Sequence, residues 1–155
     1  MYGLLLIVFI GACKKENVQA EIVAEAPNFI GTFESHALVD ENCANPEING
    51  TRLATDGGYC SMEGDTENCT RELFIIEADS SFILRVIVTK TTPATRTGIP
   101  TDYAGTYSVS GRKLTACFAS GGNCLVATIN DDNSQLGIEL LHEECTRTFL
   151  YERKL

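Results

Sequence analysis

The sequence predicts an all-β domain, an eight-stranded antiparallel, up-and-down barrel or half-barrel stabilised by disulfides. From residue 29 onward, short segments of alternating apolar and polar residues follow one another, a pattern typical of half-buried strands. Short segments that contain Gly, Asn or Asp separate most of them and are typical of tight hairpin turns. No segment carries the periodicity of a long amphipathic helix.

The predicted strands begin with residues 33–40, where apolar and polar side chains alternate. Residues 41–70 contain three cysteines and no long apolar periodicity, so we expect a long loop with a short helix or strand near residues 52–59. Residues 91–100, rich in Thr, Pro and Gly, predict a second loop. The other predicted strands are closely spaced and comprise residues 72–78, 81–90, 103–110, 113–118, 124–130, 135–142 and 146–153.

Eight strands of this kind can close on themselves, which leaves no exposed sheet edge. We expect the first and last strands to pair antiparallel, with residues 34–36 opposite residues 152–154. In that register Cys43, just past the first strand, lies near Cys145 at the start of the last strand.

Six of the seven cysteines lie in the predicted domain. An even number in a short exported chain favours disulfides. Their spacings are wider than the C-x₂₋₄-C clusters of zinc sites, so we expect no metal. The expected pairs are Cys43–Cys145 across the barrel seam, Cys117–Cys124 across a hairpin and Cys60–Cys69 within the long loop. The main alternative is an exchange of partners among Cys43, Cys60, Cys69 and Cys145.

Residues 4–13 form an apolar stretch that ends in Gly11, Ala12 and Cys13. The stretch is too short to span a bilayer as a helix, which takes about 20 apolar residues. It fits the apolar region of a secretory signal, and it resembles the lipobox of bacterial lipoproteins. A conventional signal peptide cut near Ala12 and a buried N-terminal segment are the alternatives.

The lipobox resemblance implies a cleaved signal peptide at residues 1–12 and a diacylglycerol on the sulfur of Cys13. Residues 13–28 are polar and small and predict a flexible tether. The predicted location is the bacterial cell envelope, at the outer membrane, with membrane contact through the lipid on Cys13.

The formal charge of −9 belongs entirely to the part that follows the signal, because residues 1–12 contain no charged side chain. The sequence contains no basic patch with interleaved aromatic residues, so we expect no nucleic-acid partner. A strongly acidic domain favours a cationic protein partner.

Three segments resemble the lipocalin-like lipoproteins of Bacteroidota: residues 31–33 (GTF), 105–115 (GTYSVSGRKLT) and 145–151 (CTRTFLY). This family implies a calycin-like meander barrel over residues 29–155, usually with an unknown ligand. In lipocalins an arginine of the last strand packs on a tryptophan of the first strand. Here Phe33 takes the tryptophan position, and Arg153 and Arg147 are the candidates for the arginine.

An eight-stranded barrel either fills its interior with side chains or encloses one small ligand. The candidates for the lining of a ligand cavity are the inward-facing residues Phe33, Phe74, Phe82, Tyr107, Leu114, Leu125 and Phe149. We therefore expect a binding protein for a small apolar or amphipathic ligand. The alternatives are a protein-interaction module, for instance an inhibitor of a cationic wall-degrading enzyme such as lysozyme, and a passive structural lipoprotein of the envelope.

The histidines do not predict an enzyme. A nucleophilic mechanism needs a base and an orienting group beside the nucleophile. His36 falls on the outward face of its strand, and His142 ends a strand beside two glutamates. We expect no catalytic residues and no cofactor.

Overall fold

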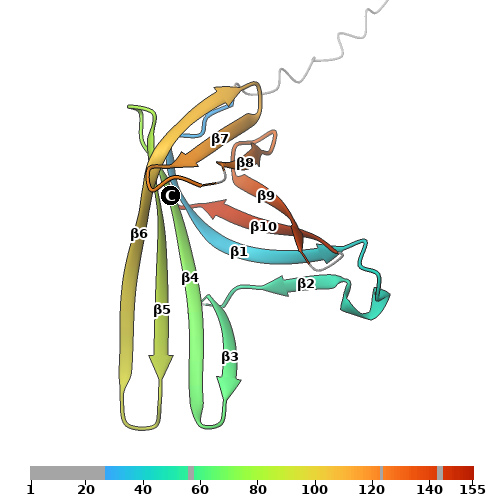
Figure 1. Cartoon of the computed structure of the whole chain (residues 1–155), viewed down its shortest axis with the longest axis vertical. Helices are drawn as coiled ribbons and strands as arrows, with labels where there is room; N and C mark the ends of the chain where they lie inside the picture. Colours follow the sequence, from blue (N-terminus) through green and yellow to red (C-terminus); the bar gives the residue numbers. More distant parts are fainter. Residues whose placement is uncertain (1–26, 56–57, 123, 143–144) are drawn as a thin grey trace, which may run out of the picture.

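The computed structural model describes residues 27–55, 58–122, 124–142 and 145–155. The predicted signal peptide, Cys13 and nearly all of the tether lie outside these residues. Among the described residues, no helix has the length and apolar character needed to cross a membrane. The described elements are β1 (Gly31–Glu41), the 3₁₀ helix η1 (Pro46–Ile48), β2 (Gly50–Leu53), β3 (Tyr59–Glu63), β4 (Thr66–Ile76), β5 (Ser81–Thr91), β6 (Arg96–Ser110), β7 (Lys113–Phe118), β8 (Cys124–Ile129), β9 (Gln135–His142) and β10 (Cys145–Arg153) (Figure 1).

The strands form a closed antiparallel barrel of eight strands, as the sequence predicts. Strands β4 to β10 follow one another as a meander, and β1 closes the barrel by pairing with both β10 and β4. The predicted seam between the first and last strands is confirmed, but its register differs. Phe33 lies opposite Arg153 and Ser35 opposite Tyr151, and the ladder is then interrupted before Ala37 by a bulge. An extra residue on one strand of a pair cannot be recognised from alternation alone.

Both predicted loops are wrong in part. Residues 41–70 contain η1, β2, β3 and the first residues of β4, and residues 91–100 belong mostly to the β5–β6 hairpin. Strand β2 and the part of β6 from Arg96 to Ala104 lack a buried face, because all of their residues are exposed. Without a buried face the side chains need not alternate in polarity, so the periodicity gives no strand signal. Pro100 is tolerated because this part of β6 forms a sheet edge.

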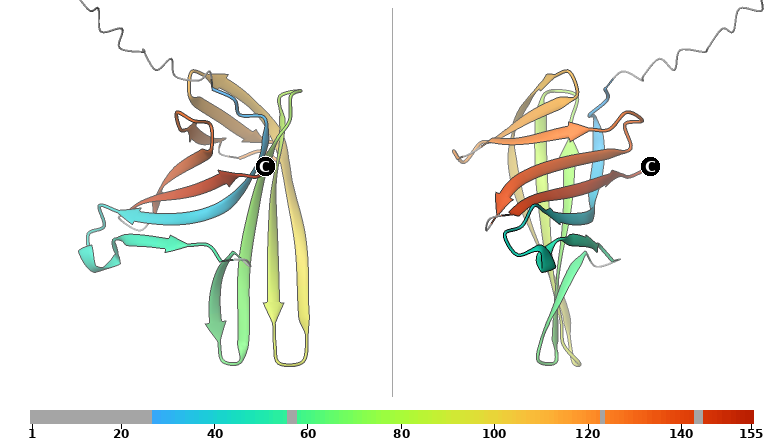
Figure 2. Two further views of the ribbon diagram at one scale, coloured as in Figure 1. Left: turned by 180° about the vertical axis from the view of Figure 1, so that it is seen from behind. Right: turned by 90° about the vertical axis from the view of Figure 1, so that its right-hand side faces the viewer.

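The barrel has one closed end and one open end. At the closed end, β1 pairs with β4 over Gly31–Glu34 and Leu73–Ile76. Beyond this ladder the two strands separate, and β2 continues along β1 while β3 continues along β4. Likewise β6 pairs with β7 only from Gly105 onward. The free parts of β4, β5 and β6, together with β3, project beyond the barrel as a sheet that we call the arm (Figures 1 and 2).

Apolar side chains fill the barrel interior. Phe74 and Phe82 stack with ring centroids 5.3 Å apart, and Phe118 meets Phe82 edge-on at the same centroid distance. A Cβ on Gly105 would lie 2.5 Å from the Phe82 ring, so only glycine leaves room for that ring. The buried core comprises Phe29, Phe33, Phe74, Ile76, Phe82, Leu114, Ala116, Ala127, Ile129, Leu136, Ile138 and Tyr151.

Arg153 of the last strand, β10, binds the residues that precede and begin β1. Its guanidinium carbon lies 4.4 Å from the centroid of the Phe33 ring. Its Nε donates to the carbonyl of Asn133 at 2.7 Å, its Nη1 donates to the carbonyl of Ile30 at 2.6 Å, and its Nη2 donates to the carbonyl of Asn28. A Cβ at Gly31, where φ is +136°, would lie 2.7 Å from Nη1. Of the two candidates from the sequence, Arg153 and not Arg147 packs on Phe33.

The three predicted disulfides are confirmed. Cys43–Cys145 links the end of β1 to the start of β10 across the seam, with a sequence separation of 102. Cys60–Cys69 joins directly opposed residues of β3 and β4, and Cys117–Cys124 does the same for β7 and β8. The first bond therefore constrains the long-range closure of the barrel, and the other two each fix one hairpin.

We predict that Arg153→Ala lowers the free energy of unfolding by about 2–4 kcal/mol, because it removes three charge-assisted hydrogen bonds and a cation–π contact. Arg153→Lys should not restore the loss, since an ammonium cannot reproduce the planar fork of donors. Urea unfolding measures both effects. The control is Arg85→Ala, which breaks an exposed pair with Asp102 and should cost far less stability than Arg153→Ala. Equal losses in the two alanine variants would contradict the role of Arg153.

We predict that loss of the seam disulfide costs more stability than loss of a hairpin disulfide. The entropy of loop closure gives about 4–5 kcal/mol for the Cys43→Ser, Cys145→Ser double variant and about 2–3 kcal/mol for the Cys60→Ser, Cys69→Ser double variant. Urea denaturation of both variants tests the difference. A larger loss in the hairpin variant would show that the seam closes without its disulfide.

Candidate ligand site at the open end of the barrel

Five of the seven predicted cavity residues belong to the filled part of the barrel. Phe33, Phe74, Phe82 and Leu114 have no exposed surface and pack within one core. Tyr107 lies at the closed end, where its hydroxyl donates to the carbonyl of Glu77 at 2.7 Å in the β4–β5 turn. These side chains themselves fill the barrel interior, so a ligand has room only on their side toward the open end.

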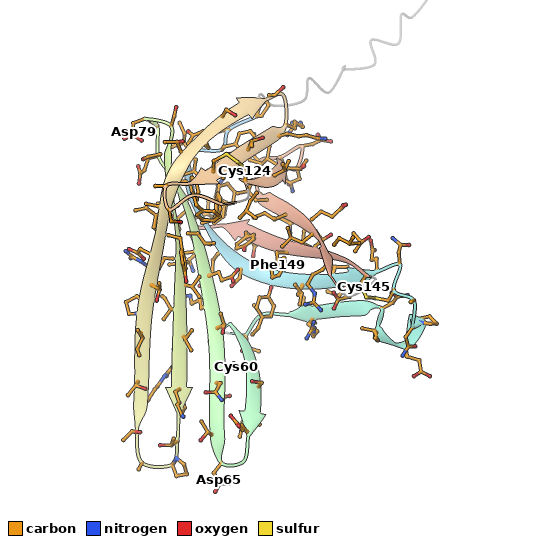
Figure 3. The ribbon with its side chains drawn as sticks, in the orientation of Figure 1. Cys60, Asp65, Asp79, Cys124, Cys145 and Phe149 are labelled. Atoms are coloured by element: carbon orange, nitrogen blue, oxygen red, sulfur yellow. A yellow bond between two sulfur atoms is a disulfide. The ribbon has the colours of Figure 1, made fainter. Side chains whose placement is uncertain are left out.

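The other two predicted residues, Leu125 and Phe149, pack against the core and are only partly buried. Phe149 (Figure 3) lies opposite Leu38, beyond the β1–β4 ladder of the closed end. Leu84 and Phe118 are likewise partly buried against the core. We call these four side chains the floor of the open end. Phe118 was missing from the predicted lining, although it continues the alternation of Leu114 and Ala116 along its strand.

Asp40 forms a buried ionic cluster at the rim, beside the floor. Its side chain is only 4% exposed. Arg147 donates to both carboxylate oxygens at 2.6 and 3.1 Å, and Arg52 donates from Nη2 to Oδ2 at 3.0 Å. The hydrogen bonds from Arg147, helped by the one from Arg52, hold the pKa of Asp40 below its usual value although burial acts in the opposite direction. The carboxylate therefore remains ionised and ties β1, β2 and β10 together.

A second polar cluster joins the arm to the barrel. The Tyr151 hydroxyl donates to Oε2 of Glu72 at 2.6 Å. The Tyr59 hydroxyl is shielded from solvent and finds no hydrogen-bond partner among the described residues. Burial, with the nearby Glu72 charge, raises the pKa of Tyr59 to about 12 and that of Tyr151 well above its usual value. Both phenols therefore stay protonated, and the Tyr151 hydroxyl acts as the donor to Glu72.

The remaining candidates for chemistry are His36, His142 and the group of Cys60, Glu67 and Cys69. His36 is on the outer surface, where its Nδ1 lies 3.4 Å from Oε2 of Glu152. Strand β9 ends at His142, and the adjacent glutamates lie outside the described residues. Cys60, Glu67 and Cys69 place ligand atoms within 4.8 Å of one another, but the Cys60–Cys69 disulfide leaves no thiolate to bind a metal there.

No family model matches the chain, and no match is found among the curated proteins or the solved structures.

We predict opposite effects for the two tyrosines. Tyr151→Phe removes the donor to the Glu72 carboxylate and should cost about 1–3 kcal/mol of unfolding free energy. Tyr59→Phe removes a buried hydroxyl that lacks a partner and should leave stability unchanged or raise it by about 1 kcal/mol. Urea unfolding of the two matched variants measures the contrast, and a destabilised Tyr59→Phe variant would show that this hydroxyl has a partner.

Proposed function

We propose that the protein is a lipid-anchored binding protein of a bacterial cell envelope, related to the lipocalin-like lipoproteins, that binds a small apolar or amphipathic ligand at the open end of its barrel. The observation that carries the proposal is the floor of Leu84, Phe118, Leu125 and Phe149. These four apolar side chains pack on the core and remain partly exposed. Covering exposed apolar surface is favourable by about 25 cal/mol per Å².

The position of the chain start supports this arrangement. Asn28 and Phe29 lie at the closed end, where the Asn28 amide donates to the side chain of Asn133 and Phe29 is buried in the core. A tether from a lipidated Cys13 would therefore join the domain at the end opposite to the floor. The ligand site would then face away from the membrane that holds the anchor.

We expect the purified protein to bind the uncharged dye N-phenyl-1-naphthylamine, with a fluorescence increase. Leu125→Asp places a charge on the floor and should weaken binding about tenfold or more, since one buried leucine contributes about 1.5–3 kcal/mol. The matched control is Val126→Asp, because Val126 is the next residue on β8 and its 49% exposed side chain points outward. Absence of dye binding, or equal effects of the two substitutions, would contradict the proposal.

An exposed apolar face of the arm favours binding of a protein partner as the second candidate function. The face of the arm that continues the barrel interior exposes Val88, Ile99 and Tyr103 by 46%, 68% and 47%. Adjacent exposed apolar residues of this kind are typical of interaction surfaces. A cationic enzyme such as lysozyme would be attracted by the net charge of −9. Salt-sensitive binding to lysozyme, without dye binding, would favour this candidate.

A further inference from the structure

An apolar row on the inner face of the arm continues directly from the floor. Every second residue of a strand shares a face, and on β5 the residues of this face are apolar from the floor residue Leu84 to Val88. On β6, Tyr103 lies opposite Leu84, and Ile99 lies opposite Val88. The Tyr103 ring also meets the ring of the floor residue Phe118 edge-on, with centroids 6.4 Å apart. We call this set the strip, and it comprises Val86, Val88, Ile99 and Tyr103, with Thr101 between the last two.

The strip is open to solvent and narrow. Three of its four apolar side chains are exposed, and Val86 is half-buried. On one side, the β4 residues of the same face are polar, with Glu72 opposite Val86 and Thr70 opposite Val88. On the other side, this part of β6 is the edge of the sheet. Neighbouring strands lie about 5 Å apart, so the strip has the width of one hydrocarbon chain.

The row on β5 ends in a cation. Lys90 is two residues beyond Val88, so it belongs to the same face. Its neighbours across the sheet are Asn68 of β4 and Thr97 of β6. The lysine is exposed, and it forms no ion pair within the part of the chain that the structure describes. From Leu84 to Lys90 the strand covers about 20 Å, at about 3.3 Å per residue.

We infer that the ligand is a long-chain carboxylate, whose single hydrocarbon tail runs from the floor along the strip and whose head group lies at Lys90. The strip connects the two sites without a break, and an ammonium attracts a carboxylate. One acyl chain reaches about half the hydrocarbon thickness of a bilayer, or about 15 Å, which is close to the length of this row. The inference rests on the proposed function and specifies the chemical class of its ligand.

The length of the ligand tests the strip. Hexadecanoate and octanoate are compared as competitors of the dye on the full-length protein at pH 8. We expect hexadecanoate to bind at least about thirtyfold more tightly, because its additional methylene groups cover the strip. Val88→Asp should weaken hexadecanoate binding about tenfold and leave dye binding at the floor unchanged. The matched control is Thr89→Asp, which adds the same charge on the opposite face of β5 and should change neither affinity.

The charge at the end of the arm tests the position of the head group. Lys90→Gln should weaken hexadecanoate binding about tenfold, as for the loss of a charge-assisted contact. Arg96→Gln is the matched control. It removes the same charge from the same end of the arm, but Arg96 lies opposite Thr91 on the outer face, so affinity should be retained.

Three outcomes would overturn the inference or its premise. Equal affinities of the wild type for the two acids, or equal effects within either pair of variants, would overturn the inference while the apolar floor stands. A urea midpoint for each variant checks that it folds. Absence of dye binding would overturn the proposed function and this inference together.

Discussion

The packing of Arg153 on Phe33 determines where this barrel is closed. One side chain stacks on the first strand and donates hydrogen bonds to carbonyls of the segment before β1 and of the β8–β9 turn. Because these groups come from both ends of the domain, the contact fixes the first strand against the last. Phe33 then extends into the core, and Phe29 is buried beside it. The remaining strands must close around this end.

Closure at one end leaves the other end free to widen. Strands β1 and β4 pair over a short ladder and then separate, and the chain between them fills the gap with β2 and β3 (Figure 1). The Tyr151–Glu72 hydrogen bond connects the two separating walls, and the Asp40 cluster ties β2 and β10 to β1. Polar groups thus stabilise the rim, while the apolar floor remains partly exposed. The packing of Arg153 on Phe33 closes one end of the barrel around a filled core, and the apolar surface is left at the other end.

The sequence predicted the barrel strands well because each has a buried and an exposed face, and alternation reports this difference. It predicted Cys43–Cys145 and Cys117–Cys124 because the seam and one hairpin placed these cysteines near one another, and Cys60–Cys69 was the pair that remained. It did not predict β2, β3 or the arm part of β6, whose exposed side chains give no periodic signal. Leu125 and Phe149 were recognised as inward-facing, but alternation cannot tell a filled level of a barrel from an open one. The partners of Asp40 depend on a register that a bulge shifts, so this cluster could not be predicted.

The proposed ligand site is confined to the open end of the barrel. Hydrogen exchange measured by mass spectrometry, with and without saturating N-phenyl-1-naphthylamine, tests this placement most directly. We predict slower exchange in peptides that contain Leu38, Leu84, Leu125 and Phe149, and unchanged exchange in the segment from Asn28 to Phe33 at the closed end. Slower exchange at the closed end, or no change anywhere, would contradict it.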